Sequence, residues 1–120
     1  MPHLDPESVK LLEDAVFAYT EGRFNDAFPV LEKLASTGNL EAIRGLAEMY
    51  LRGEGVEANV QAGIKLLRHA ADLGHANSAY CLGALYRSGA YGVPRDAEQS
   101  KFFFLLAKDL GCELPIHERP

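Results

Sequence analysis

Apolar residues recur at helical spacing along the whole chain, in six stretches that each end at or near a glycine. The first stretch follows Asp5 and Pro6, a favoured N-cap residue and a proline suited to the first helical position, and it ends at Gly22. Its predicted buried stripe is Leu11, Leu12, Ala15, Val16 and Tyr19. The same spacing predicts five further helices, with stripes that contain Val30, Leu31, Leu34 and Ala35; Ala42, Leu46, Ala47 and Tyr50; Leu66, Leu67, Ala70 and Ala71; Ala79, Leu82, Gly83 and Tyr86; and Phe103, Phe104 and Ala107.

Capping residues set the predicted starts of these helices. We expect Asn39, Asn59 and Asp96 to cap the third, fourth and sixth helices, because their side chains accept hydrogen bonds from backbone N–H groups of the first turn. The second helix is predicted to start at Asn25 or Asp26. Pro29 then falls in its first turn, where a missing N–H costs little.

A repeated pattern organises these helices into pairs. Tyr50-x-x-Gly53 and Tyr86-x-x-Gly89 lie 36 residues apart, and similar residues follow each of them. One unit of two short helices cannot bury its own apolar face, so copies must stack. The sequence therefore predicts an all-α fold, an alpha-alpha superhelix (solenoid) of three antiparallel helical hairpins, right-handed, in a single domain over residues 1–120. The predicted units are about 6–38, 39–74 and 75–111, followed by a C-terminal tail, 112–120.

The repeat residues resemble the Sel-one-like repeat family, a relative of the tetratricopeptide repeats. Two parts of the chain carry the resemblance, 42–74 and 78–111. The matching positions are Ala42, Leu46, Tyr50, Gly53, Gly55, Val56, Ala70, Ala71 and Gly74, and then Leu82, Gly83, Tyr86, Gly89, Gly92, Val93, Asp96, Phe103, Ala107 and Gly111. The first unit lacks the Gly-x-Gly-Val turn and is more similar to a tetratricopeptide turn.

The resemblance implies a non-catalytic protein–protein interaction module, an adaptor or scaffold that docks a peptide or protein on its helical-repeat surface. One alternative is a bacterial regulatory or immunity-type protein that sequesters one specific partner. An enzyme with an unrecognised site is a less favoured alternative. Secreted members of the family pair cysteines within each hairpin, and Cys81 and Cys112 do not occupy those positions, so that subtype is disfavoured. A disulfide between these two cysteines is less favoured than two thiols, because the N-terminus suggests a reducing compartment.

Composition narrows the partners. With a net charge of −5 and no run of basic residues longer than two, the chain is not expected to bind nucleic acid. Its longest fully apolar run, residues 102–107, is too short to span a bilayer, so no membrane partner is expected. The first residues have neither a basic start nor an apolar stretch, and we therefore expect no signal peptide and a cytoplasmic location.

Catalytic and metal-binding signatures are missing from the sequence. The histidines His3, His69, His75 and His117 show no ligand spacing, and no nucleophile elbow or phosphate-binding loop occurs. Gly53-Glu54-Gly55 follows a helix rather than a strand, so it is interpreted as a turn between helices. No catalytic residue, cofactor or metal is predicted.

Two surfaces are candidate binding sites. In tetratricopeptide-type solenoids the first helix of each hairpin lines a concave groove, which here predicts Glu41, Arg44, Glu48 and Arg52 in one unit and Asn77, Tyr80 and Arg87 in the next. Arginine forks suit carboxylates, so the groove could hold an acidic peptide; the alternative is an ordinary solvated face of mixed charge.

The second candidate is an apolar face on the last helix. Phe102, Leu105 and Leu106 share one side of that helix, where the earlier units carry polar or charged residues and Pro29. Such a face demands a cover. Either Leu114 and Ile116 of the tail fold back onto it, which we favour, or it is a partner interface, including a homodimer through the C-terminal helix.

Overall fold

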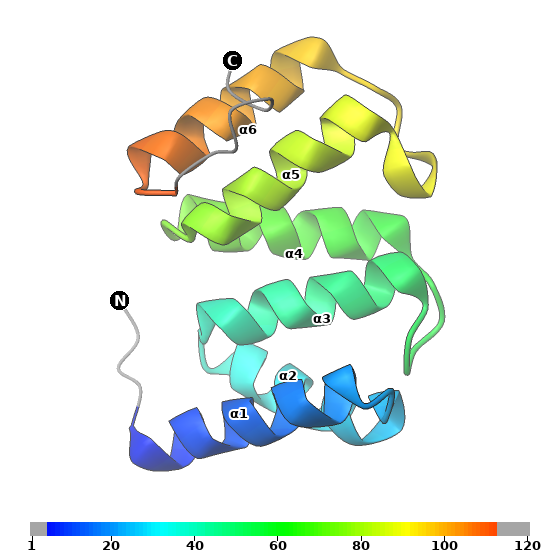
Figure 1. The fold of residues 1–120 in the computed structure, drawn as a ribbon, viewed down its shortest axis with the longest axis vertical. Helices are drawn as coiled ribbons and strands as arrows, with labels where there is room; N and C mark the ends of the chain where they lie inside the picture. Colours follow the sequence, from blue (N-terminus) through cyan, green and yellow to red (C-terminus); the bar gives the residue numbers. More distant parts are fainter. Residues whose placement is uncertain (1–4, 113–120) are drawn as a thin grey trace. The chain divides into compact units, whose positions relative to one another are not determined.

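The computed structural model of the chain describes residues 5–112. Within that range it contains six α-helices, one short 3-10 turn and no β-strand. The elements, labelled in Figure 1, are α1 (Pro6–Thr20), α2 (Phe24–Ser36), α3 (Leu40–Arg52), α4 (Val60–Asp72), α5 (Ala76–Ser88), η1 (Ala90–Gly92) and α6 (Ala97–Asp109).

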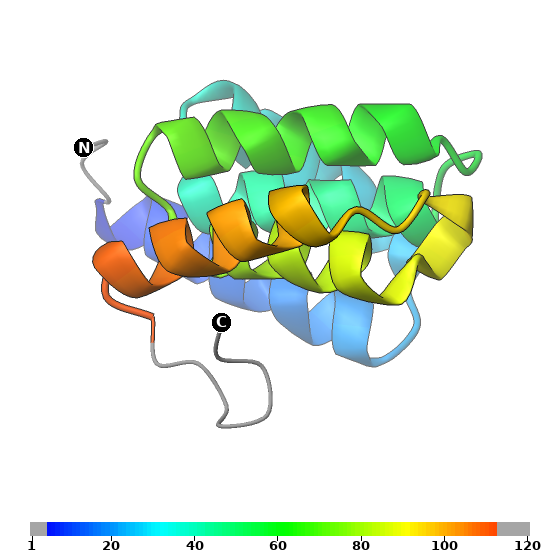
Figure 2. The same cartoon turned by 90° about the horizontal axis from the view of Figure 1, so that it is seen from above.

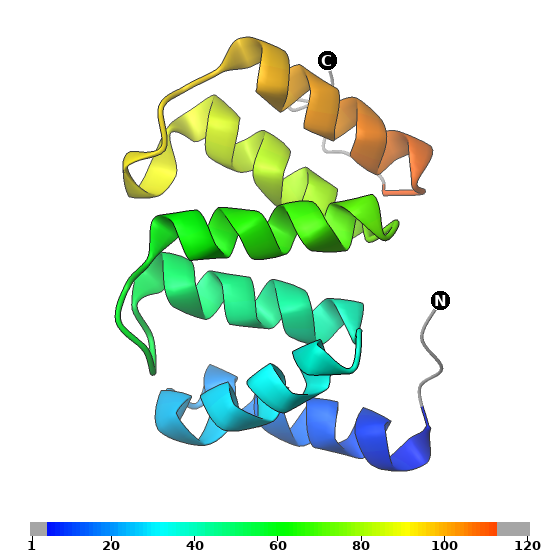
Figure 3. The ribbon, with the colours of Figure 1, turned by 180° about the vertical axis from the view of Figure 1, so that it is seen from behind.

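These helices form two compact units, of which the first ends at Leu66 and the second begins at Leu67, inside α4. In the first unit α1 and α2 form an antiparallel hairpin, and α2 also packs against α3. Figure 3 shows α2 lying across the back of α1 and α3. In the second unit α5 and α6 form an antiparallel hairpin, visible in Figures 1 and 2. The single domain inferred from the sequence stays a prediction.

Side-chain caps start the helices where the sequence predicts them. The carboxylate or amide oxygens of Asp5, Asn39, Asn59 and Asp96 accept hydrogen bonds of 2.7–3.1 Å from backbone N–H groups three residues later. These bonds satisfy N–H groups that the first turn of a helix leaves without partners. The capping predictions are therefore confirmed.

The α2 helix departs from its predicted start. It begins at Phe24, one or two residues earlier than expected, with Arg23 at the N-cap. Pro29 consequently lies in the second turn, inside the helix, and not in the first turn. There the missing N–H leaves the carbonyl oxygen of Asn25 without its usual intrahelical donor. The earlier start follows from Asp26 and Ala27, whose N–H groups both donate to the Arg23 carbonyl, at 3.2 and 3.1 Å.

One buried cluster of the first unit contains several small residues. Its members are Ala15, Ala18, Ala27, Leu31, Leu34, Ala42 and Met49. Leu31 and Leu34 were predicted to be buried, and they are. Val16 was also predicted to be buried and is not, because the alanines of α1 face α2 and leave Val16 49% exposed.

Small residues also allow close approaches between helices. A Cβ placed on Gly63 of α4 would lie 2.8 Å from Cγ of Leu51 in α3. In the second unit a Cβ on Gly83 of α5 would lie 2.7 Å from the ring of Phe104 in α6. Beside that contact the Ser100 hydroxyl donates a 2.9 Å hydrogen bond to the Gly83 carbonyl. The α3–α4 contact and the α5–α6 contact thus each include one position that has no room for a larger side chain.

Candidate functional site

The first unit contains a groove between α1 and α3 with a volume of about 330 Å³. Figure 1 shows these two helices side by side. The residues lining the groove are Leu12, Val16, Tyr19, Leu31, Glu41, Arg44, Gly45, Glu48 and Arg52. All four groove residues predicted for this unit are therefore brought together in one cavity.

The floor of this groove, which we call the α1–α3 groove, is apolar. Leu12, Val16 and Tyr19 lie on one side of α1, and Leu31 of α2 lies between the two helices. The sequence did not predict Leu12, Val16 and Tyr19 as groove residues. Groove positions were inferred from the repeat motif, and the first helical hairpin, residues 6–38, lacks that motif. The spacing of Leu12, Val16 and Tyr19 at i, i+4 and i+7 was the available signal.

Gly45 keeps this groove open. A Cβ placed on Gly45 would lie 3.3 Å from Cδ1 of Leu31, so an ordinary side chain here would occupy space in the cavity. Gly45 is half-buried near the middle of α3. A glycine in a helix interior costs stability relative to alanine, and here it also leaves the cavity its full width.

The charged residues of the groove are paired with one another. Nε of Arg44 lies 3.3 Å from Oε2 of Glu41, and Nε of Arg52 lies 3.1 Å from Oε2 of Glu48. Both pairs join neighbours on one face of α3. The two glutamates offset the positive field of the two arginines, so an acidic ligand would have to compete with them. The rim is polar but carries little net charge of its own.

A hydrogen bond fixes one end of the groove. The Tyr19 hydroxyl donates to Oε1 of Glu54 over 2.7 Å, which joins α1 to the turn after α3. Burial of the phenol, together with this bond and the charge of Glu54, raises the pKa of Tyr19 to about 12. The turn itself is held close to α2, because a Cβ on Gly55, whose φ is +73°, would lie 2.7 Å from the Phe24 carbonyl oxygen.

The other predicted groove residues lie on α5 in the second unit. Asn77 and Arg87 are exposed, and Tyr80 is half-buried with its ring centroid 5.5 Å from that of Phe104. A single groove that combines them with Glu41, Arg44, Glu48 and Arg52 stays a prediction.

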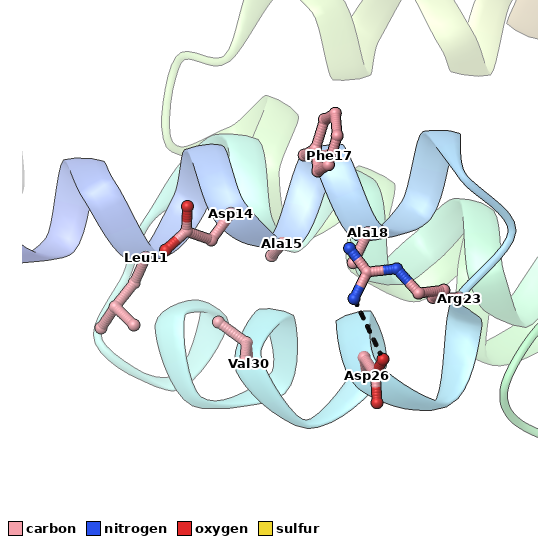
Figure 4. Close-up of a pocket in the computed structure, with 8 residues that line it drawn as sticks. All are labelled: Leu11, Asp14, Ala15, Phe17, Ala18, Arg23, Asp26 and Val30. Atoms are coloured by element: carbon pink, nitrogen blue, oxygen red, sulfur yellow. Dashed lines mark hydrogen bonds and ion pairs between the residues drawn. The ribbon is translucent and has the colours of Figure 1, made fainter.

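A second cavity, of about 340 Å³, lies between α1 and α2 and was not anticipated from the sequence. Figure 4 shows its lining residues, which are Leu11, Asp14, Ala15, Phe17, Ala18, Arg23, Asp26 and Val30. Arg23 is held there by ion pairs to Glu21 at 3.0 Å and to Asp26 at 3.3 Å. The ring of Phe17 in this cavity is exposed. In the sequence, the available signal for this surface was an aromatic residue that lies outside the predicted buried stripe of the first helix.

The apolar face of α6, which the sequence led us to expect to be covered, has two exposed residues. Phe102 is 60% exposed and Leu105 is 41% exposed, while Leu106 is half-buried. The tail residues Leu114 and Ile116, expected to cover this face, lie outside the described residues. Whether the tail or another chain covers it therefore stays a prediction.

The described residues offer no metal centre. Among residues 5–112 no group of three His, Cys, Asp or Glu side chains is placed to hold a metal ion. Cys81 and Cys112 are both half-buried. In the same part of the chain no helix is both long and apolar enough to cross a membrane.

Comparison with known proteins places this architecture. A Sel1 repeat protein from Oxalobacter formigenes has a similar structure, with a TM-score of 0.73 and 24% sequence identity over 90% of this chain and 47% of that one. This likeness confirms the predicted helical-repeat solenoid fold. An F-box protein of Arabidopsis thaliana is 30% identical over 90 residues, which cover 71% of this chain. The chain spans only 26% of the length of that relative.

Two copies of the Sel1 repeat are recognised within the chain itself, over residues 40–75 and 76–112. They confirm the resemblance drawn from Tyr50, Gly53, Tyr86 and Gly89. Together the two copies cover more than half of the sequence. The chain therefore belongs to the Sel1 repeat family, whose repeats are typically non-enzymatic helical scaffolds and generally serve as protein–protein interaction modules.

Proposed function

We propose that this chain is an adaptor that docks a peptide segment of a partner protein in the α1–α3 groove. The observation that carries the proposal is the composition of this groove, an apolar floor below a rim of two intrahelical ion pairs. A volume of about 330 Å³ suits one or two apolar side chains of a peptide. Interaction modules of this kind recognise partners through apolar pockets with polar edges.

The groove supports tight docking because much of it is already ordered. The Tyr19–Glu54 hydrogen bond ties α1 to the turn after α3, and Gly55 brings that turn against α2. Binding to a preorganised surface loses less conformational entropy than binding to a mobile one. Most of the conformational entropy lost on binding is therefore that of the partner peptide.

The charged rim sets the orientation of the peptide rather than most of its affinity. Arg52 is half-exposed and already engages Glu48, so a partner carboxylate gains less there than at an arginine without an acidic neighbour. The acidic peptide that the sequence allowed as one of two readings of the groove is accordingly replaced by a peptide that inserts an apolar side chain and places polar groups along α3.

A variant pair on α1 tests this proposal. Val16 lines the groove and is 49% exposed, whereas Val9 is 37% exposed and outside it. Both substitutions, Val16→Asp and Val9→Asp, should fold, because both valines already face solvent. A partner captured from the native lysate by the wild-type chain should be lost with Val16→Asp and retained with Val9→Asp.

Quantitative binding with the purified partner completes the test. We expect Val16→Asp to weaken binding by at least tenfold, because a carboxylate would be desolvated in an apolar site. Equal affinities for the two variants would exclude the groove as the docking site. A protein that sequesters one specific partner would instead bury a larger surface and tolerate either single substitution. A cytoplasmic location stays a prediction from the sequence.

A further inference from the structure

The second unit presents an arginine, Arg68, that is held in place but forms no ion pair with any residue in the described range 5–112. Nη2 of Arg68, on α4, donates a 2.8 Å hydrogen bond to the hydroxyl of Tyr86 on α5. Its guanidinium carbon lies 5.1 Å from the ring centroid of Phe103 on α6 and 5.8 Å from that of Tyr86. These two rings are stacked, with an interplanar angle of 10°. Three helices thus fix one exposed guanidinium.

Arg68 differs in this respect from three arginines of the first unit. Arg23, Arg44 and Arg52 each have an ion pair with a nearby carboxylate. Within residues 5–112 no carboxylate lies within ion-pair distance of Arg68. Asp72 is four residues along the same helix but does not engage it. Because guanidinium groups carry five donors, Arg68 retains donors for an external acceptor after its bond to Tyr86.

The apolar face of α6 adjoins this arginine through a shared ring. Phe103 contacts Arg68 on its face, and the Phe102 ring lies edge-on to Phe103 with a centroid separation of 5.1 Å. Phe102 is 60% exposed and Leu105 is 41% exposed. A fixed cation beside exposed apolar side chains complements a ligand that combines a carboxylate with large apolar groups.

We propose that this surface, formed by Arg68, Phe102 and Leu105, docks a peptide segment of a second partner protein that carries one carboxylate beside two or three large apolar side chains. The carboxylate pairs with Arg68 and the apolar side chains cover Phe102 and Leu105. This site lies wholly in the second unit and does not depend on the α1–α3 groove. An adaptor with two such sites could link two proteins.

The charges at the ends of the α6 face argue for a single carboxylate and against a second copy of the chain. Glu98 and Asp109 lie on the same side of α6 as Phe102 and Leu105, one at each end. They would repel a peptide with several acidic residues. Antiparallel pairing of two α6 helices through this face would bring Glu98 of one copy against Asp109 of the other.

Peptide selection tests the proposal directly. A phage library of random 12-residue peptides is selected on the full-length wild-type chain and depleted on a variant with Arg68→Gln and Phe102→Ser. We expect the surviving peptides to share one Asp or Glu within three positions of Leu, Ile, Phe or Met. Failure to recover peptides that discriminate the two proteins, or survivors without a carboxylate, would overturn the proposal.

Binding of one synthetic survivor then resolves the two halves of the site. Replacing its carboxylate by the amide should weaken binding by roughly tenfold or more, and Arg68→Lys should do the same, because a lysine cannot reproduce the stacked, forked contact. Arg95→Gln, which alters another exposed arginine of the second unit, should leave affinity unchanged. Melting curves of the variants confirm that they are folded. An unchanged affinity for the amide peptide would contradict the role of Arg68.

The other occupants of the surface give distinct results. A doubled mass in solution that Phe102→Asp returns to the monomer would assign the face to a second copy. A tenfold gain in peptide affinity on changing Leu114 and Ile116 to serine would assign it to the tail of this chain. Either result would overturn the proposal that an external partner binds this surface. Loss of binding with Val16→Asp alone would concern the α1–α3 groove and not this surface.

Discussion

The phenol of Tyr19 donates a 2.7 Å hydrogen bond to Oε1 of Glu54, and this bond joins two segments that are 35 residues apart in the sequence. It links α1, which belongs to the atypical helical hairpin that precedes the two Sel1 repeats, to the Gly53-Glu54-Gly55 turn of the first of those repeats. The bond therefore stabilises both the packing of α1 and one end of the α1–α3 groove.

Removing this hydroxyl should destabilise the first unit. We expect Tyr19→Phe to lower the free energy of unfolding by about 1–2 kcal/mol, because the bond has a charged acceptor but is only partly buried. Chemical denaturation followed by circular dichroism measures the change. Tyr91→Phe is a matched control, because Tyr91 is 42% exposed in the turn after α5. Equal stabilities of the two variants would mean that the Tyr19–Glu54 bond contributes nothing.

The same bond predicts a loss of stability at high pH. The pKa of Tyr19 is raised to about 12 in the folded chain from the ordinary value of 10.0, mainly by burial and then by the bond to Glu54. Above pH 10 the unfolded chain has lost the phenol proton while the folded chain retains it, so unfolding becomes more favourable as the pH rises. The contribution is complete below pH 10 and is lost as the pH rises through 12.

Comparing wild type with Tyr19→Phe isolates this effect from the other tyrosines and the lysines. The difference between their free energies of unfolding should shrink between pH 10 and pH 12. A difference that stays constant across that range would show that the phenol titrates normally in the folded chain.

The repeat made most of the fold predictable. The groove floor was not predictable in this way, because its residues lie in the first helical hairpin, residues 6–38, which lacks the repeat motif. Tyr50, Gly53 and their counterparts at 86 and 89 specify helix ends and turns locally, and such signals survive in sequence. The exposure of Val16 depends instead on how α1 rotates against α2, which is set by the contacts of Ala15 and Ala18. No local pattern encodes that rotation, because alanine and valine are equally compatible with a helix stripe.

Arg68 was hidden for a related reason. In the sequence it reads as one of several solvated charges on the fourth helix, next to His69. Its significance comes from the stacked rings of Tyr86 and Phe103, which lie 18 and 35 residues later and reach it only through the packing of three helices. Groups that meet in this way are visible only once the tertiary structure is known.

Gly45 should show opposite effects on stability and binding. Replacing it by alanine removes a helix-interior glycine, which favours the folded state by about 1 kcal/mol. The new Cβ meets only the flexible end of Leu31, at 3.3 Å, so little of that gain is lost. We therefore expect Gly45→Ala to raise the free energy of unfolding by about 0.5–1 kcal/mol, while narrowing the groove and weakening partner binding. Denaturant titration and calorimetry measure the two effects.

The same substitution at Gly63 provides the contrast. Its Cβ would lie 2.8 Å from Cγ of Leu51 and 3.0 Å from the backbone oxygen of Ala47, and a backbone atom cannot move aside cheaply. Gly63→Ala should therefore lower the free energy of unfolding by about 1–3 kcal/mol in spite of its better helix propensity. A stabilised Gly63→Ala variant would show that α3 and α4 pack less closely than described.

Pro29 gives the last prediction, which follows from its place inside α2. The residue is exposed and lies in the second turn, where an N–H would reach the carbonyl of Asn25. Pro29→Ala restores that donor and removes the clash of the ring with the preceding turn, at the cost of a more flexible unfolded chain. Because interior prolines cost about 3 kcal/mol and those near a helix start cost less, we expect a net gain of about 1–2 kcal/mol in the free energy of unfolding. A neutral result would place Pro29 energetically in the first turn, as the sequence had suggested, and thermal denaturation monitored by circular dichroism distinguishes the two outcomes.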